Sequence, residues 1–255
     1  MEFLTDLWYL VPLLFLAGLL DGIAGGGGII AFPAYMMTGM PIYSVYACNK
    51  LQSGLGTLCS CLKYTKEKLI DVKVALLAIP STILSSFLVT KLVMSISEDT
   101  IKIIIAICLP IAVIVMFLKR KVSASKQVSH KLTAKTVLLA LLSGAILGSY
   151  DALFGPGGGT IAVMVFSLLL NYDLRVGSGN GKLIIVASNI TAVINYIASG
   201  HMIWHVALPC SLANMIGSYI GAAIVVKKGE KIIFPAMLVV VASLIIQIIL
   251  GFIQK

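Results

Sequence analysis

The sequence predicts an all-α protein that crosses a membrane several times. Of its 255 residues, 59% are hydrophobic and only 11% are charged, and the mean hydropathy is +1.05. These values lie far from those of ordinary soluble domains. Apolar runs of membrane-spanning length recur along the whole chain, separated by short polar turns, so a single membrane domain covering 1–255 accounts for the entire sequence.

Ten apolar segments are expected, and two of them are too short to cross a bilayer. They are 7–20, 29–39, 45–62, 72–93, 101–118, 134–154, 160–170, 176–198, 203–226 and 231–252. A helix needs about 20 residues to cross the hydrocarbon core, so 29–39 and 160–170 are too short. Each follows a glycine cluster, GGGG at 25–28 or GPGGG at 155–159. The clusters therefore predict breaks in the helices.

The distribution of basic residues predicts how the chain is threaded. Lysine and arginine concentrate at 63–73, 119–131 and 227–231, and such segments favour the cytoplasmic side. If each glycine unit crossed once, 227–231 would face outside; if each unit returns to its starting side, all three segments face inside. We therefore expect a hairpin or paired short helices at each break, three full spans after it, and both termini outside.

The two halves of the chain also match each other in sequence. The matching pairs, in order, are GGGIIA at 26–31 with GGGTIA at 157–162, Asn49 with Asn180, Lys50 and Leu51 with Lys182 and Leu183, Tyr64 with Tyr196, and VAL at 74–76 with 206–208. An ordered series of this kind is hard to obtain by chance, which favours duplication.

The repeats are expected to be inverted, because each half would hold an odd number of full crossings. We place repeat 1 at 7–118, a cytoplasmic linker at 119–133 and repeat 2 at 134–252. Inverted repeats with broken helices are a common architecture of secondary transporters, whose substrates bind near the midplane.

The breaks themselves favour an anion. Helices that start near Ile29 and Thr160 would present unpaired N–H groups and the positive end of the helix dipole. Glycine lets a ligand approach the backbone closely. The alternative is that the glycines only permit tight helix packing. The candidate substrate-binding glycines are Gly25, Gly26, Gly27, Gly28, Gly155, Gly157, Gly158 and Gly159.

Two lysines and several amides and hydroxyls inside the apolar runs extend this candidate site. Lys50 and Lys182 occupy matching places, and lysines within membrane spans usually face the bundle interior. The alternative is that they reach back to the membrane surface. The polar candidates nearby are Asn49, Gln52, Ser53, Asn180, Ser188 and Asn189; singly, each could instead join helices.

Asp21 and Asp151 precede the glycine clusters by four residues each. Each could carry a coupling proton, pair with a lysine or cap a helix end. Coupling to protons or sodium is therefore left open, and no cofactor is expected. The basic residues lie in loops between apolar runs, so they indicate topology and no nucleic-acid partner is expected. The expected partners are the lipid bilayer and the small anion.

Other polar residues carry weaker alternatives. His201 and His205 have metal-ligand spacing but no nearby carboxylate, so no metal site is expected. Ser178 could form a serine–histidine pair with one of them, as an intramembrane enzyme would need. The two histidines lie at the opposite end of the same predicted span, however, too far for a hydrogen bond to Ser178, which disfavours an enzyme. The five cysteines (Cys48, Cys59, Cys61, Cys108 and Cys210) lack CxxC spacing and are expected to be reduced.

The doubled motifs resemble those of the sulfite-exporter TauE/SafE (TSUP) family. DGIAGGGGIIAFP and NKLQSGLGT in the first half, and YDALFGPGGGTIAV, GKLIIVASNITA and GHMIWHVAL in the second, carry the resemblance over nearly the whole chain. It implies transport of sulfite, thiosulfate, sulfonates or sulfoacetate and coupling to an ion gradient. Pro156 and Gly181 have no counterpart in the first half, so the two half-sites are not expected to be equivalent.

Together these observations predict a secondary transporter of small anions in the bacterial inner membrane, working by alternating access. An anion channel of the same architecture is the alternative. The sequence leaves open the oligomeric state, the coupling ion and the direction of transport.

Overall fold

The chain folds into a bundle of helices. The computed structural model describes residues 3–97, 100–101, 131–228, 231–233 and 235–236, and these ranges contain no strand. The elements are η1 (Leu4–Asp6), α1 (Leu7–Ala24), α2 (Gly28–Met36), α3 (Ile42–Lys66), α4 (Val72–Ser95), α6 (Ala134–Leu153), α7 (Gly158–Leu170), α8 (Leu174–Ala198) and α9 (Trp204–Lys228). The all-α prediction is confirmed.

Five helices in the described ranges are long and apolar enough to cross a membrane: α1 with η1, α4, α6, α8 and α9. Helix α3 has 25 residues, but polar residues such as Asn49 and Lys50 lower its hydropathy. Helices α2 and α7, with 9 and 13 residues, are too short to cross alone. The protein is a multi-pass membrane protein. The spans expected at 101–118 and 231–252 lie largely outside the described residues.

The two glycine clusters break the helical path as predicted, although the helix ends are shifted. Helix α1 continues to Ala24, four residues beyond its predicted end, and α7 begins at Gly158, two residues before its predicted start. Gly25 and Gly155 both have a φ near +74°, at 73° and 74°. This left-handed conformation favours glycine and turns the chain out of one helix toward the next.

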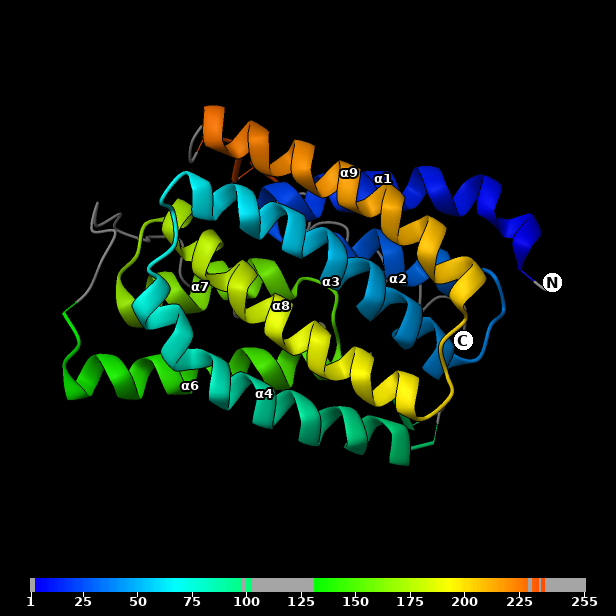
Figure 1. Cartoon of the computed structure of the whole chain (residues 1–255), viewed down its shortest axis with the longest axis horizontal. Helices are drawn as coiled ribbons and strands as arrows, with labels where there is room; N and C mark the ends of the chain where they lie inside the picture. The colour runs from blue at the N-terminus through cyan, green and yellow to red at the C-terminus, as the bar shows by residue number, and fades with distance from the viewer. Residues whose placement is uncertain (1–2, 98–99, 102–130, 229–230, 234, 237–255) are drawn as a thin grey trace.

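The second half of the bundle runs through the molecule in the opposite direction to the first. Helix α1 leads away from the end that holds the N-terminus and α2 turns back toward it, whereas α6 starts at the other end and α7 returns there (Figure 1). Helices α3 and α8 are antiparallel, as are α4 and α9. Each half thus has a broken hairpin and inverted long helices. The exact repeat limits, 7–118 and 134–252 around a linker at 119–133, stay a prediction.

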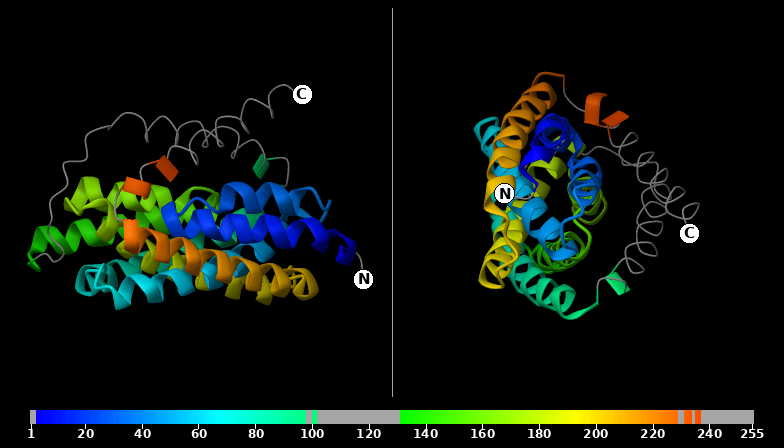
Figure 2. Two further views of the ribbon diagram at one scale, coloured as in Figure 1. Left: turned by 90° about the horizontal axis from the view of Figure 1, so that it is seen from above. Right: turned by 90° about the vertical axis from the view of Figure 1, so that its right-hand side faces the viewer.

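Helices of the first half pack closely against helices of the second half through small residues. Helix α1 packs most extensively against α9, and α4 against α6. A methyl group added to Gly18 would lie 2.2 Å from the carbonyl oxygen of Asn214, and one added to Gly144 would lie 2.2 Å from that of Ala78. Small residues allow such backbone contact between membrane helices. The long helices consequently run along roughly one common axis (Figure 2).

The described basic segments gather at one end of the bundle. The C-terminal ends of α3, with Lys63 and Lys66, and of α9, with Lys227 and Lys228, lie at the end where α6 begins (Figure 1). Helix α9 starts at the opposite end with Trp204, which is 47% exposed, as expected for an aromatic belt at a membrane surface. This arrangement agrees with hairpins that return to their starting side.

Cysteine labelling in whole cells tests this threading. In a cysteine-free background, Lys66→Cys and Lys228→Cys should react from the same side of the membrane, because the two helix ends lie together. Ser199→Cys, at the far end of α8, should react from the opposite side. Labelling of Lys66→Cys and Lys228→Cys from opposite sides would overturn the inverted arrangement.

Candidate anion site at the glycine breaks

The tips of the two broken hairpins touch each other near the middle of the bundle. The backbone N–H of Thr160 donates to the carbonyl oxygen of Gly25 at 3.3 Å, and the Thr160 hydroxyl donates to that of Ala24 at 2.7 Å. A methyl group on Gly25 would lie only 2.3 Å from the Cα of Gly159. Two chain breaks from different repeats therefore form a single polar centre.

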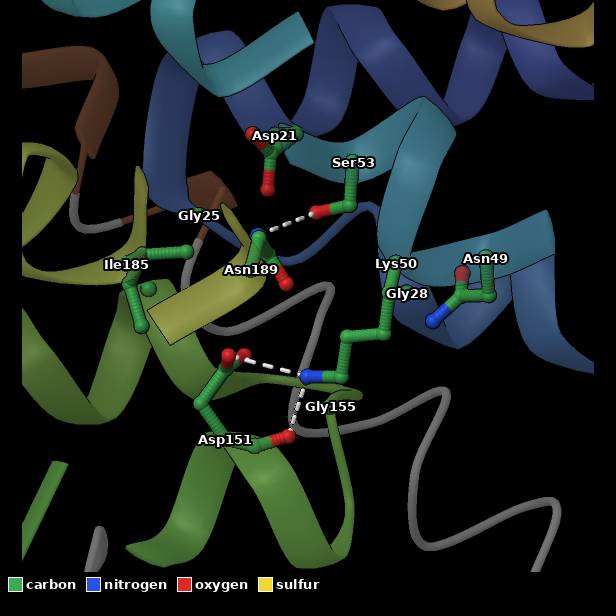
Figure 3. A pocket seen from close by; sticks show the side chains of 11 residues that line it. Asp21, Gly25, Gly28, Asn49, Lys50, Ser53, Asp151, Gly155, Ile185 and Asn189 are labelled. Carbon is green, nitrogen blue, oxygen red and sulfur yellow. Dashed lines mark hydrogen bonds and ion pairs between the residues drawn. The ribbon is translucent and has the colours of Figure 1, made fainter. Parts of the chain in front are cut away.

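A small cavity lies at this junction (Figure 3). Its walls are formed by Asp21, Gly25, Gly28, Asn49, Lys50, Ser53, Asp151, Gly155, Gly159, Ile185 and Asn189. The first residue of α2, Gly28, and the second residue of α7, Gly159, both line it, so two helix N-termini reach the same wall. The volume of about 10 Å³ is close to the minimum that holds one water molecule. In this conformation the cavity is too small for a molecule larger than water.

A buried ion pair joins the two repeats across the cavity. The Nζ of Lys50 lies 2.8 Å from Oδ2 of Asp151, and the exposed fractions of the two side chains are 1% and 4%. The same ammonium donates to the backbone carbonyl of Asp151. Lys50 lies eight residues inside α3, which is about 12 Å along the helix axis. Its ammonium thus points into the bundle instead of reaching the membrane surface.

The matching lysine of the second repeat has a different partner. Lys182 also lies eight residues after the start of its helix, but its Nζ donates to the backbone carbonyl of Asp21 at 2.8 Å. The Asp21 carboxylate instead accepts a hydrogen bond from the Thr57 hydroxyl at 3.0 Å. The Lys182 ammonium also lies 5.6 Å from the centre of the Tyr64 ring. The two half-sites are non-equivalent, and one of the two lysines forms an ion pair.

Three predicted amide and hydroxyl residues border the cavity together. The Asn189 amide nitrogen lies 3.4 Å from the Ser53 hydroxyl, which links α8 to α3. Asn49 lines the cavity and accepts a hydrogen bond from the Gln52 amide at 3.1 Å. The Asn189 carbonyl oxygen is buried without a hydrogen-bond partner. The cavity wall beside the ion pair therefore carries one hydrogen-bond acceptor with unused capacity, the side-chain oxygen of Asn189.

The remaining predicted residues do not line this cavity. They are Gly26, Gly27, Gln52, Gly157, Gly158, Asn180, Lys182 and Ser188. The Ser188 hydroxyl donates to Ser86 at 3.1 Å and so joins α8 to α4. Gly157, with a φ of 76°, shapes the turn before α7.

Asn180 holds a turn at the basic end of the bundle. Its side-chain oxygen accepts the Asp71 backbone N–H at 2.8 Å, and the Asp71 carboxylate accepts the Tyr172 hydroxyl at 2.7 Å. Burial, followed by this hydrogen bond, raises the pKa of Tyr172, so the hydroxyl stays protonated and remains a donor. Asn180 and its counterpart Asn49 consequently have different surroundings.

Two residues at the centre were not predicted from the sequence. Thr57, the partner of Asp21, stands seven residues after Lys50, on the same face of α3. Ile185, the apolar wall of the cavity, stands three residues after Lys182 on α8. Helical spacing from the two lysines is the signal that could have found both.

The alternative sites receive no support from the geometry. The Ser178 hydroxyl donates to Tyr64 at 3.3 Å in the first turns of α8, whereas His201 follows the opposite end of that helix and packs against Tyr43. Among the described residues no cluster of three histidine, cysteine or acidic side chains is arranged to hold a metal ion. The described cysteines are free thiols; Cys108 lies outside the described residues.

Inverted repeats that meet in broken helices around a buried polar centre define a class, the membrane transporters. The particular family follows from comparison with known proteins: the profile of sulfite exporter TauE/SafE matches residues 10–248. The chain belongs to this family, which is one of transporters and not of enzymes.

Curated relatives agree with this assignment. The probable membrane transporter protein YfcA of Escherichia coli (strain K12) is 29% identical over 95% of this chain and 92% of its own length. A probable membrane transporter protein of Haemophilus influenzae is 29% identical over 88% and 87%, and YdhB of Bacillus subtilis is 22% identical over 84% and 88%. No solved structure matches the chain.

Double-mutant analysis tests the ion pair. Asp151→Ala should lower the free energy of unfolding by about 3–5 kcal/mol, because it leaves the Lys50 ammonium buried without its counter-charge. The double variant Lys50→Met with Asp151→Ala should lose less than Asp151→Ala alone, measured by thermal or denaturant unfolding in detergent. Glu67→Ala removes the partner of Lys63 in a surface pair and serves as control, with no measurable change expected. If the changes in the free energy of unfolding caused by Lys50→Met and by Asp151→Ala simply add in the double variant, a direct pairing is contradicted.

Enlarging a glycine at the hairpin contact tests whether the tips must touch. A methyl group on Gly159 would lie 2.4 Å from the Cα of Gly25, so Gly159→Ala should lower the free energy of unfolding by about 1–3 kcal/mol through overpacking. Gly54→Ala is the matched control, since its nearest neighbour is a side-chain atom of Asn189 at 3.1 Å. Equal unfolding midpoints for the two variants would argue against backbone contact at the breaks.

Proposed function

We propose that this protein is a secondary carrier that binds a small oxyanion between the two glycine breaks. The observation that carries the proposal is the buried ammonium of Lys50 at the cavity where the N-termini of α2 and α7 meet. Helix N-termini favour negative charge, and a lysine adds a full positive charge. The other side chains proposed to bind the anion are those of Asn49, Ser53 and Asn189, which also line the cavity.

The small size of the cavity supports alternating access as the mode of transport. The cavity has close to the minimum space that holds one water molecule, so it is too small for sulfite or any larger oxyanion. Substrate can therefore enter only after the walls separate. The walls come from both repeats, so a rocking movement of one repeat against the other would open the site to one side at a time.

Sulfur-containing anions are the substrates we propose, on the strength of the family name. The geometry favours an anion, and the family adds sulfite, thiosulfate, sulfoacetate and related sulfonates as the class to test first. We place the protein in the bacterial inner membrane with the basic ends of α3 and α9 in the cytoplasm and both termini outside, following the preference of lysine for that side.

Coupling to an ion gradient is part of the proposal. Asp21 and Asp151 both line the cavity, and acidic residues inside membrane spans commonly carry protons or bind sodium during transport. Either ion could neutralise a carboxylate when an anion is bound. An anion channel with the same architecture is the second candidate, favoured by the direct contact of two helix N-termini with one polar cavity.

Transport by reconstituted proteoliposomes tests the proposed function. Uptake of labelled sulfite, thiosulfate, sulfoacetate and taurine, with sulfate as a further oxyanion, should identify a transported anion, and preloaded unlabelled substrate should accelerate its uptake. Counterflow of this kind occurs through a carrier and not through an open channel. Cation flux with no anion transport would overturn the anion proposal.

Lysine variants assign the transport to the site. Lys50→Ala should reduce uptake at least tenfold, because the anion loses the one cationic side chain among the described residues that line the cavity; an affinity loss of 1.4 kcal/mol already corresponds to tenfold. Lys182→Ala should impair uptake less, since its ammonium contacts Asp21 and does not line the cavity. Lys63→Ala, on the surface of the same helix, is the control. Wild-type affinity in Lys50→Ala would exclude this residue from the binding site.

A further inference from the structure

We infer that the Asp151 carboxylate is a built-in competitor of the transported anion, and that protonation of Asp151 frees Lys50 to bind one negative charge. The inference rests on the anion-carrier function proposed above and deepens it. It names the coupling ion as the proton, assigns the residue that binds it and sets the ratio at one proton for each singly charged anion.

The Lys50 ammonium already has an anionic partner. It contacts Oδ2 of Asp151 at 2.8 Å and also donates to the backbone carbonyl of the same residue. Both groups are almost completely buried. Figure 3 shows the Asp151 carboxylate against the Lys50 ammonium. A carboxylate oxygen thus takes the place on Lys50 that an oxygen of a sulfonate or sulfite would need. The substrate must displace an anion that is tethered to α6.

The charges around the cavity balance without a substrate. The ionisable groups on the cavity wall are Asp21, Lys50 and Asp151, and Lys182 contacts the backbone of Asp21. Two acids and two bases give a formal sum of zero when all four are ionised. A further anion would leave one uncompensated negative charge in a buried place, which is strongly unfavourable. One proton taken up with the anion restores the sum to zero.

The geometry selects Asp151 over Asp21 as the group that takes the proton. The carboxylate of Asp21 accepts a hydrogen bond from Thr57, and Lys182 contacts its backbone oxygen and not its carboxylate. Protonation of Asp21 would leave Lys50 still bound to Asp151. Protonation of Asp151 turns the carboxylate into a neutral acid, which weakens the ion pair and releases the ammonium.

In the part of the chain that the structure describes, few other charged groups near Asp151 could produce the same pH dependence. Helix α7 contains no acidic or basic residue. Helices α4 and α8 also pack on α6. Their charged residues are Lys73 and Lys91, toward the two ends of α4, and Arg175 and Lys182 on α8. Lys50 of α3 and Asp21 of α1 line the cavity. On α6 itself, Tyr150 donates to the Pro156 carbonyl, and Lys135 lies in the first turn.

The consequence is electroneutral transport of a singly charged anion. The empty site contains ionised Asp151 paired with Lys50; the loaded site contains neutral Asp151 and the anion paired with Lys50. Both have the same formal charge. Opening either form first to one side of the membrane and then to the other therefore transfers no net charge. The pH gradient and the anion gradient drive transport, and the membrane potential does not contribute.

Binding measured as a function of pH tests the inference. The probes are labelled methanesulfonate and thiosulfate, whose own charges do not change between about pH 5.5 and about pH 8.5, with full-length protein in nanodiscs. Where Asp151 is ionised, uptake of one proton per anion requires the methanesulfonate Kd to rise about tenfold per pH unit. In weakly buffered solution, a pH indicator should report one proton taken up per methanesulfonate bound.

Three variants assign the proton to a residue. Asp151→Asn should bind the probe with a Kd that no longer changes with pH and that stays low at alkaline pH. Asp21→Asn should keep the tenfold slope. Asp173→Asn is the matched control, because asparagine also caps α8 well; it should behave as the wild type. Should Asp151→Asn not fold, Asp21→Asn decides the question: a slope and proton count kept in this variant support Asp151, and their loss overturns the assignment.

The outcomes separate this inference from the function on which it rests. Anion binding whose Kd does not change with pH, or a slope that is lost in Asp21→Asn and kept in Asp151→Asn, would overturn the role of Asp151 while leaving an anion carrier. Absence of binding by both probes, together with absence of transport in the proteoliposome screen, would overturn the anion function itself.

Discussion

A charged lysine inside the membrane needs a partner, and this requirement organises the centre of the protein. Lys50 lies deep in α3, with 1% of its side chain exposed, and Asp151 of the other repeat supplies the counter-charge at 2.8 Å. Removing one member of a buried pair is costly, whereas the pair itself gives little net stability. Its position at the junction of the repeats therefore agrees better with a role in binding than with a role in folding.

The broken hairpins explain how so much polarity is accommodated in an apolar chain. Irregular backbone at membrane depth is tolerated where protein covers it or where it lines a cavity. Here each break covers the other: Thr160 of the second hairpin donates to Gly25 of the first, and α2 and α7 begin at a shared cavity. The close glycine seams between α1 and α9 and between α4 and α6 hold the repeats around it.

The fold was largely predictable from the sequence, and the site was predictable as a set of residues more than as a set of contacts. Hydropathy, glycine clusters and repeated motifs predicted the helices, the breaks and the inversion, because each depends on local pattern. Ten of the eleven residues that line the cavity came from the candidates, with Ile185 the exception. The partners of Lys50 and Asp21 could not be predicted, because they depend on the packing of helices that are distant in the sequence. The matching motifs around the two lysines also gave no sign that Lys50 forms an ion pair while Lys182 does not.

The central claim is that an anion binds between the glycine breaks against Lys50. The most direct measurement is an experimental structure at low pH with a heavy anion such as selenate, located by its anomalous scattering. The account predicts a peak within hydrogen-bonding distance of the Lys50 ammonium, between Gly28 and Gly155, with the Asp151 carboxylate moved away from Lys50. A bound anion elsewhere, with the ion pair of Lys50 and Asp151 intact, would contradict it.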